Sequence, residues 1–140
     1  MEIILDTNFL IYCAKEKLDY VEELRRIFNE PYELVVPEQV IQELEKIKNK
    51  TKQNIPLKKR KPRYKKTTGK DKLAADLALQ LLKKNKIKTT NPQGKTVDQA
   101  IINLAKENPK NIVCTLDREM RKILNRVILI NKGKKLMLTK

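Results

Sequence analysis

The sequence alternates short apolar runs with segments that carry apolar residues at helical spacing, and this order strongly constrains the fold. Five short runs are typical of buried strands: residues 3–5, 34–36, 112–116, 127–130 and 136–139. The segments between the first four runs repeat apolar residues every three or four positions, as amphipathic helices do. Strands that alternate with helices predict an α/β fold with helices on the faces of a sheet.

Capping and breaking residues mark the ends of the expected helices. Pro31 ends the second helix, and Pro37 suits the first turn of the third. Thr96 and Gln99 have the spacing of a capping box at the start of the fifth. The expected helices cover residues 7–14, 18–29, 37–49, 71–85, 96–107 and 118–124.

The apolar residues of the fourth expected helix, in residues 71–85, recur every four positions. Leu73, Leu77 and Leu81 are therefore expected to form its buried stripe. Asp76 falls beside Gln80, away from that stripe, and is expected on the surface.

Charge is segregated along the chain. Residues 1–45 hold 4 basic and 11 acidic residues, whereas residues 46–72 hold 13 basic residues and one acidic residue. The net charge of +15 favours a polyanion as partner, and a nucleic acid rather than a membrane, because no basic amphipathic helix stands out. Heat adaptation or codon bias is the alternative explanation for so many lysines. The length of 140 residues favours a single domain over 1–140, and without a membrane span or signal peptide we expect a cytoplasmic protein.

The composition excludes several kinds of catalysis. The chain has no His, which excludes His-based acid–base chemistry and imidazole zinc sites. Its two cysteines, Cys13 and Cys114, lie in apolar runs and are expected to be core thiols. Any chemistry must therefore come from carboxylates, amines or hydroxyls.

Two carboxylates directly follow apolar runs. Asp6 follows residues 3–5, and Asp117 follows residues 112–116. Ligands gather outside the carboxyl ends of parallel strands, so both acids point to one site. The alternative is that each merely caps the next helix.

Two further acids lie on or beside apolar helix faces. Glu43 borders the stripe of Val40, Leu44 and Ile47, and Asp98 falls inside the apolar arc of its helix, where it is expected to be buried. A first-turn Asp that interacts with the helix dipole is the alternative for Asp98. Four clustered acids would repel one another, and a hard cation such as Mg²⁺ or Mn²⁺ would resolve this. An Asp/Glu glycosidase is disfavoured, because a chain without Trp offers little surface for sugar stacking.

Five segments together resemble the PIN-domain ribonucleases. They are "LDTNFLIY" (5–12), "VPEQVIQELEKI" (36–47), "TVDQAIINLA" (96–105), "IVCTLDREMRKIL" (112–124) and the closing "VILINKGKKLML" (127–138). The resemblance covers the whole chain, and the four acids occur in the family's order and approximate spacing.

This resemblance implies a three-layer α/β/α sandwich with a central, mainly parallel sheet. It also implies Mg²⁺- or Mn²⁺-dependent endonucleolytic cleavage of RNA by an activated water, leaving a 5′-phosphate and a 3′-hydroxyl. The implied catalytic and metal-binding residues are Asp6, Glu43, Asp98 and Asp117. Asn8 and Thr115 match positions that orient ligands or water, and Glu119 lies near a fifth acid of some relatives, unless it is simply a first-turn helix acid.

Two branches of the family compete. "VDQAI" and "GKKLML" are more similar to the PIN proteins that process ribosomal RNA than to the toxins of toxin–antitoxin pairs. The expected partners are accordingly RNA, with a ribosome precursor or an antitoxin protein, and a homodimer is a further expectation. A non-catalytic RNA-binding assembly factor and a structure-specific DNA nuclease are the remaining alternatives.

Residues 50–70 contain Pro56, Pro62 and Gly69 and few apolar residues, which predicts a mobile basic loop. Positioned RNA binding and nonspecific binding of any polyanion are both compatible with this composition. The expected RNA-binding residues are Lys58, Lys59, Arg60, Lys61, Arg63 and Tyr64, together with Arg118 and Arg121.

Overall fold

One sheet organises the part of the chain that the computed structural model describes, residues 1–50 and 69–139. Its strands are β1 (Glu2–Leu5), β2 (Glu33–Pro37), β3 (Lys88–Thr90), β4 (Ile112–Cys114), β5 (Val127–Ile130) and β6 (Leu136–Thr139). They are arranged in the order β3-β2-β1-β4-β5-β6. All neighbouring strands are parallel except β5 and β6, which are antiparallel. The expected mainly parallel sheet is confirmed.

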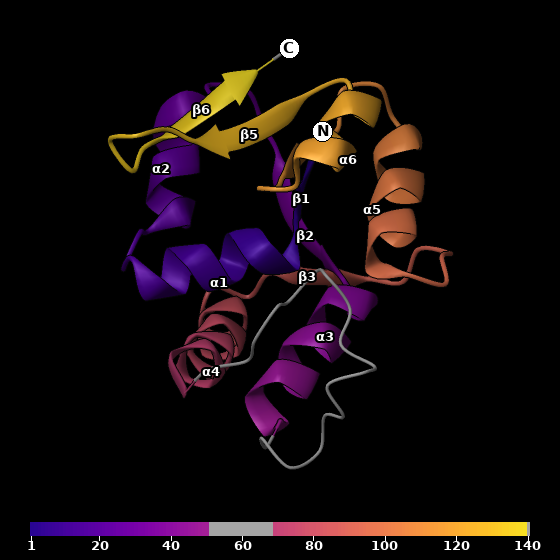
Figure 1. The fold of residues 1–140 in the computed structure, drawn as a ribbon. Helices are drawn as coiled ribbons and strands as arrows, with labels where there is room; N and C mark the ends of the chain where they lie inside the picture. Colours follow the sequence, from indigo (N-terminus) through magenta and orange to yellow (C-terminus); the bar gives the residue numbers. More distant parts are fainter. Residues whose placement is uncertain (51–68, 140) are drawn as a thin grey trace.

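Helices cover both faces of this sheet. They are α1 (Thr7–Lys15), α2 (Tyr20–Ile27), α3 (Glu38–Asn49), α4 (Gly69–Lys84), α5 (Val97–Lys106) and α6 (Arg118–Ile123). The sheet lies between α5 and α6 on one side and α1 and α2 on the other (Figure 1). The described residues thus form the three-layer α/β/α sandwich that the family resemblance implies.

The N-terminal strand β1 forms the centre of the core. Ile4 of β1 pairs with Val35 of β2 on one side and with Val113 of β4 on the other. All three side chains are fully buried. Strands covered on both faces must be apolar throughout, which is why these runs are recognisable in the sequence. None of the described helices is both long enough and apolar enough to cross a membrane.

Several expected boundaries are wrong by about two residues. The strand expected over 112–116 ends at Cys114, the helix expected over 18–29 covers only Tyr20–Ile27, and the loop expected over 50–70 ends earlier because α4 begins at Gly69. Strand β3 was not expected. Its sequence, Lys-Thr-Thr, is polar and lies at the edge of the sheet, so it carries no apolar signal.

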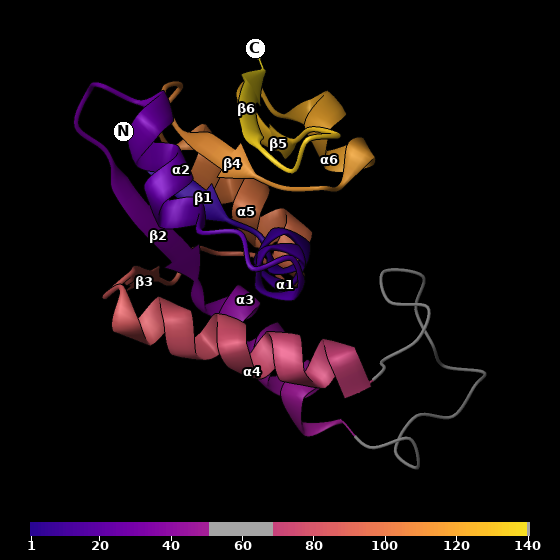
Figure 2. The ribbon, with the colours of Figure 1, turned by 90° about the vertical axis from the view of Figure 1, so that its left-hand side faces the viewer.

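The buried face of α4 is not the expected one, since Leu73 and Leu77 are exposed and Leu81 is only half-buried. Its buried residues are Ala74, Ala75, Ala78 and Leu82. Leu73 and Leu77 are 73% and 38% exposed. The helix packs against both α3 and α1 (Figure 2), and alanines let two helices approach it closely, which leucines would prevent.

Asp76 is less isolated than expected. Its carboxylate accepts a hydrogen bond from Gln80 at 3.0 Å, as their spacing predicts, but it also pairs with Lys48 of α3 at 3.2 Å. The side chain is 37% exposed. Asp76 therefore helps to join α4 to α3 and is not a neutral surface position.

The expected basic loop lies mainly outside the described residues. Its candidate RNA-binding side chains, Lys58, Lys59, Arg60, Lys61, Arg63 and Tyr64, all fall within residues 51–68. Their assignment stays a prediction.

Candidate active site

Asp6 occupies the junction between β1 and α1 and is completely buried. Its Oδ1 accepts a hydrogen bond from the peptide nitrogen of Thr7 at 2.7 Å, and its Oδ2 accepts one from the Thr115 hydroxyl at 2.7 Å. Its own peptide nitrogen donates to the carbonyl oxygen of Cys114 at 3.1 Å. The carboxylate is thus fixed on both oxygens at the carboxyl end of the central strand.

Asp117 is joined to Asp6 through Thr115. The peptide nitrogen of Asp117 donates to the Thr115 hydroxyl oxygen at 3.0 Å. The Asp117 carboxylate caps α6 by accepting hydrogen bonds from the peptide nitrogens of Glu119 at 2.9 Å and Met120 at 3.3 Å. The helix-capping role of Asp6 and Asp117 is confirmed, and both acids stand at the same edge of two adjacent parallel strands. Their role in a common ligand site stays a prediction.

Glu43 and Asp98 face a common cleft between α3 and the start of α5. The cleft has a volume of about 400 Å³, and both side chains line it. Glu43 is half-buried beside the buried Leu44, as the helical pattern predicts. Asp98 is also half-buried, which corrects the expectation of a buried carboxylate, because the buried positions of α5 are Ala100, Ile101 and Leu104.

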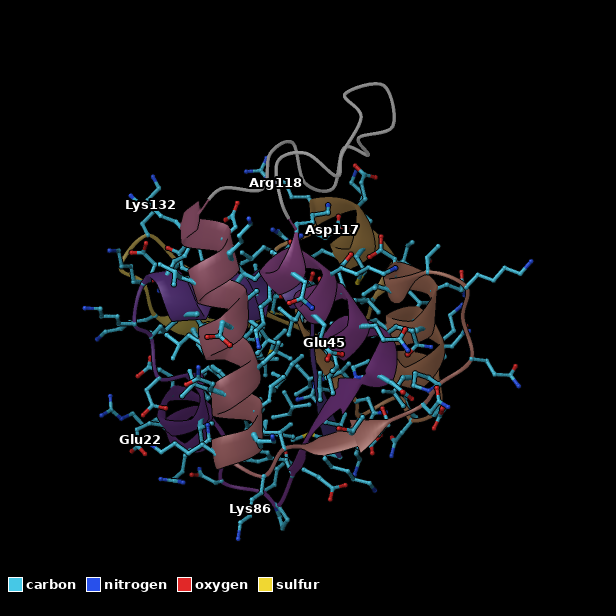
Figure 3. The ribbon with its side chains drawn as sticks, turned by 90° about the horizontal axis from the view of Figure 1, so that it is seen from below. Glu22, Glu45, Lys86, Asp117, Arg118 and Lys132 are labelled. Carbon is cyan, nitrogen blue, oxygen red and sulfur yellow. The ribbon has the colours of Figure 1, made fainter. Side chains whose placement is uncertain are left out.

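The remaining described candidates lie around these acids. Asn8 is half-buried in the first turn of α1. The Glu119 side chain is 83% exposed and pairs with Lys122 of the same helix at 3.5 Å, as a surface helix acid would. Arg118 and Arg121 are exposed on α6, and Figure 3 shows Arg118 beside Asp117.

The two cysteines are core thiols, as expected, and are unsuited to nucleophilic chemistry. Burial raises the pKa of Cys13 to about 12. Burial also raises the pKa of Cys114 well above its ordinary value, with smaller contributions from Cys13 and Asp6. Both thiols stay protonated near neutral pH, so neither is a ready nucleophile or metal ligand.

The donor set of the candidate site fits a hard divalent cation. All four candidate ligands are carboxylates, and oxygen ligands suit Mg²⁺ or Mn²⁺. Within residues 1–50 and 69–139, no three Asp, Glu or Cys side chains lie close enough together to hold an ion directly. This spacing still suits Mg²⁺, which commonly keeps several water ligands and binds only one or two carboxylates directly.

Five polar residues of the cleft between α3 and α5 were not among the candidate site residues. Besides the two acids, it is lined by Gln39, Gln42, Lys46, Lys95 and Thr96. The lysines could have been found from spacing, because each lies three positions from one of the acids, Glu43 or Asp98. Their proximity to each other depends on tertiary structure.

Comparisons with known proteins agree with this fold. Residues 3–132 match the model of a family described as PIN like domain. The chain is 37% identical over 123 residues to the Ribonuclease VapC4 of Methanocaldococcus jannaschii, an alignment that covers 88% of this chain and 82% of the relative. The structure is similar to that of the PIN domain endonuclease Utp24, with a TM-score of 0.69 and 18% identity over 98% of this chain and 90% of the other.

These matches define the class of protein. The chain belongs to the PIN-like domain family.

Proposed function

We infer that this protein is a Mg²⁺- or Mn²⁺-dependent endoribonuclease that cleaves single-stranded or structured RNA. The observation that carries this proposal is the fully buried Asp6 carboxylate, held by Thr115 at the end of the central strand beside Asp117. Both oxygens of this carboxylate accept hydrogen bonds, which offsets part of the cost of its burial and fixes it in one orientation, as a metal-binding residue requires. The 37% identity to a protein named a ribonuclease supports the choice of RNA.

The proposed roles of the residues follow from their positions. Asp6 and Asp117 would act on the cation from the edge of the sheet, and Glu43 and Asp98 from the cleft between α3 and α5. One or two of these acids would bind it directly and the others through its water ligands. Thr115 would orient the Asp6 carboxylate, and Asn8 would orient a ligand or water from the first turn of α1. When bound, the cation would neutralise the phosphate and activate the attacking water.

The test is a cleavage assay with single-stranded RNA and single-stranded DNA of the same sequence. We expect RNA cleavage in Mn²⁺ or Mg²⁺, none in EDTA, and products that a 5′-phosphate-dependent exonuclease degrades. Equal cleavage of DNA would favour the DNA nuclease alternative. RNA cleavage that persists in EDTA would refute the metal-dependent mechanism.

For the biological role we propose RNA processing, with a ribosome precursor as the substrate and the cytoplasm as the site of action. A toxin role is the second candidate, and the exposed leucines of α4 favour it. Leu73 and Leu77 form an apolar stripe on the surface that a protein partner such as an antitoxin would cover.

Expression of the chain alone in a bacterial host separates the two roles. A toxin would arrest growth, and Asp6→Asn would restore it. A processing enzyme would leave growth unaffected at the same expression level.

A further inference from the structure

The cleft between α3 and α5 carries positive charge directly beside two of the proposed catalytic acids. Lys46 extends from α3 next to Glu43, and Lys95 precedes α5 next to Asp98. All four side chains line the same cavity of about 400 Å³. A ligand that fills this cavity would therefore contact both lysines and lie beside the acids.

The two lysines are not engaged by carboxylates of the described part of the chain. Both are exposed, and the ion pairs formed there involve other lysines. Lys48, only two positions after Lys46 on α3, is turned the other way and pairs with Asp76 of α4. The ammonium groups of Lys46 and Lys95 thus remain available for a ligand.

Lys95 extends from a loop that is fixed at two points. The side-chain amide of Gln39 on α3 donates a hydrogen bond to the carbonyl oxygen of Pro92 at 2.8 Å. The side-chain amide of Asn103 on α5 donates to the carbonyl oxygen of Gln93 at 2.6 Å. These bonds hold the loop against both walls of the cleft.

Gly94 brings the same loop into direct contact with α5. Its φ angle is +155°, and a Cβ atom at this position would lie 2.5 Å from the peptide nitrogen of Ala100. Only glycine allows this close approach. The backbone at Lys95 is therefore fixed before a ligand arrives, which lowers the entropy cost of ordering the loop on binding.

We propose that this cleft binds one nucleotide of a single-stranded RNA next to the scissile phosphate, with Lys46 and Lys95 contacting its phosphate groups. The proposal rests on the proposed ribonuclease function. The cavity lies at the lower end of the usual range for ligand pockets, roughly 300–1,000 Å³, which suits one nucleotide. The two ammonium groups would offset the repulsion between RNA phosphates and the neighbouring carboxylates.

The proposal is tested by the double variant Lys46→Gln/Lys95→Gln. Binding of a fluorescein-labelled single-stranded RNA is measured by fluorescence anisotropy in EDTA over a series of KCl concentrations. Each phosphate contact on a single strand contributes about −0.7 to the slope of log K against log[salt]. We expect binding weakened roughly tenfold and a slope reduced in magnitude by about 1.4.

A matched control removes the same charge elsewhere. Lys83→Gln/Lys106→Gln changes two exposed lysines, on α4 and α5, that do not line the cleft. This control should bind RNA with the wild-type salt slope, and Lys46→Arg/Lys95→Arg should retain most of the binding. A Lys46→Gln/Lys95→Gln variant with the same affinity and slope as the control would overturn the proposal.

The binding measurement is independent of cleavage, so the two proposals fail in different ways. If the wild type binds RNA through these lysines but cleaves none in Mg²⁺ or Mn²⁺, the ribonuclease function fails and the nucleotide cleft stands. If the wild type cleaves RNA and the double variant keeps its KM, the cleft fails and the function stands. A raised KM with unchanged kcat supports both.

Discussion

The hydroxyl of Thr115 donates a hydrogen bond of 2.7 Å to Oδ2 of Asp6, across a sequence separation of 109 residues. The same hydroxyl oxygen accepts a hydrogen bond from the peptide nitrogen of Asp117 at 3.0 Å. One threonine therefore sets the position of two of the proposed catalytic acids. The contact with Asp6 forms because β1 and β4 are adjacent and parallel, with Leu5 opposite Cys114. The contact with Asp117 is local, between residues two positions apart.

Replacing Thr115 by Val should weaken both the fold and the site. Val keeps the shape of the side chain but leaves the buried Asp6 oxygen without this donor and the Asp117 peptide without this acceptor. We expect the free energy of unfolding to fall by about 2 kcal/mol, as for the loss of a buried hydrogen bond to a charged group. Urea unfolding measures this loss, and Thr115→Ser should retain most of the stability. Equal stabilities of the Val and Ser variants would contradict the role of the hydroxyl.

Asp6→Asn should abolish RNA cleavage and leave the fold intact. The variant removes one negative charge from clustered acids, and its amide oxygen can still accept the hydrogen bond from the peptide nitrogen of Thr7. Cleavage in Mn²⁺ and thermal unfolding followed by circular dichroism test the two halves of this prediction. Glu43→Gln, Asp98→Asn and Asp117→Asn should behave alike, because residues that act as a unit are not additive.

A control for these variants must be an acid outside the site. Asp76 is unsuitable because it pairs with Lys48. Glu45, which Figure 3 labels, is exposed on α3 two positions after Glu43. It does not line the cleft between α3 and α5. Glu45→Gln should cleave RNA at the wild-type rate. Near-wild-type cleavage by Asp6→Asn in Mg²⁺ would exclude the assigned metal site.

The buried thiol of Cys13 should make stability depend on alkaline pH. Its pKa is raised from 9.0 to about 12 by burial, so between these values the folded protein keeps a proton that the unfolded chain loses. The free energy of unfolding must therefore fall as pH rises above about 9, by at most about 1.4 kcal/mol per pH unit for this group. Urea unfolding between pH 8 and pH 10.5 should show a shallower decrease for Cys13→Ala than for the wild type. Parallel curves would rule this effect out.

The assignment of the buried face of α4 can be tested by substitution. Leu73→Gln should change the free energy of unfolding by less than about 0.5 kcal/mol, because the side chain is 73% exposed. Ala75→Leu should cost about 1–3 kcal/mol, because Ala75 is fully buried in a closely packed face. Thermal unfolding of the two variants compares these losses. A larger loss for Leu73→Gln than for Ala75→Leu would show that the leucines, and not the alanines, form the buried face.

The predicted basic loop is testable through its salt dependence. Replacing Lys58, Lys59, Arg60, Lys61 and Arg63 by Ser should flatten the salt slope of RNA binding, because phosphate contacts release counterions. Tyr64→Ala should weaken binding without changing the slope, since stacking releases none. An unchanged slope in the five-fold variant would indicate that RNA is held elsewhere, with Arg118 and Arg121 on α6 as the next candidates.

Apolar continuity made the central sheet predictable. Strands β1, β2 and β4 are buried on both faces, so their runs stand out from the flanking polar residues. The acids at their ends were predictable for the same reason, since Asp6 and Asp117 directly follow two such runs. The cleft between α3 and α5 was not predictable from the sequence, because it depends on the contact between Gln39 and the loop before α5.

The buried face of α4 was predicted wrongly because leucine spacing was the only guide, whereas packing against two other helices decides which side is buried. The regular spacing of its leucines indicates an apolar face, but the alanines face α1 and α3 because only small side chains fit between closely packed helices. Strand β3 was not predicted because an edge strand needs no apolar residues and so leaves no apolar run in the sequence. In both cases the structure is determined by packing or pairing with an element that is distant in the sequence.

The sheet order has a consequence for the synthesis of this protein. Strand β1, which precedes the other described strands in the sequence, lies inside the sheet and requires β4 as its neighbour. A nascent chain on the ribosome cannot bring Thr115 to Asp6 until residue 115 has been synthesised. If the acids at this edge form a nuclease site, a growing or truncated chain stays inert, and the translating messenger is not exposed to it.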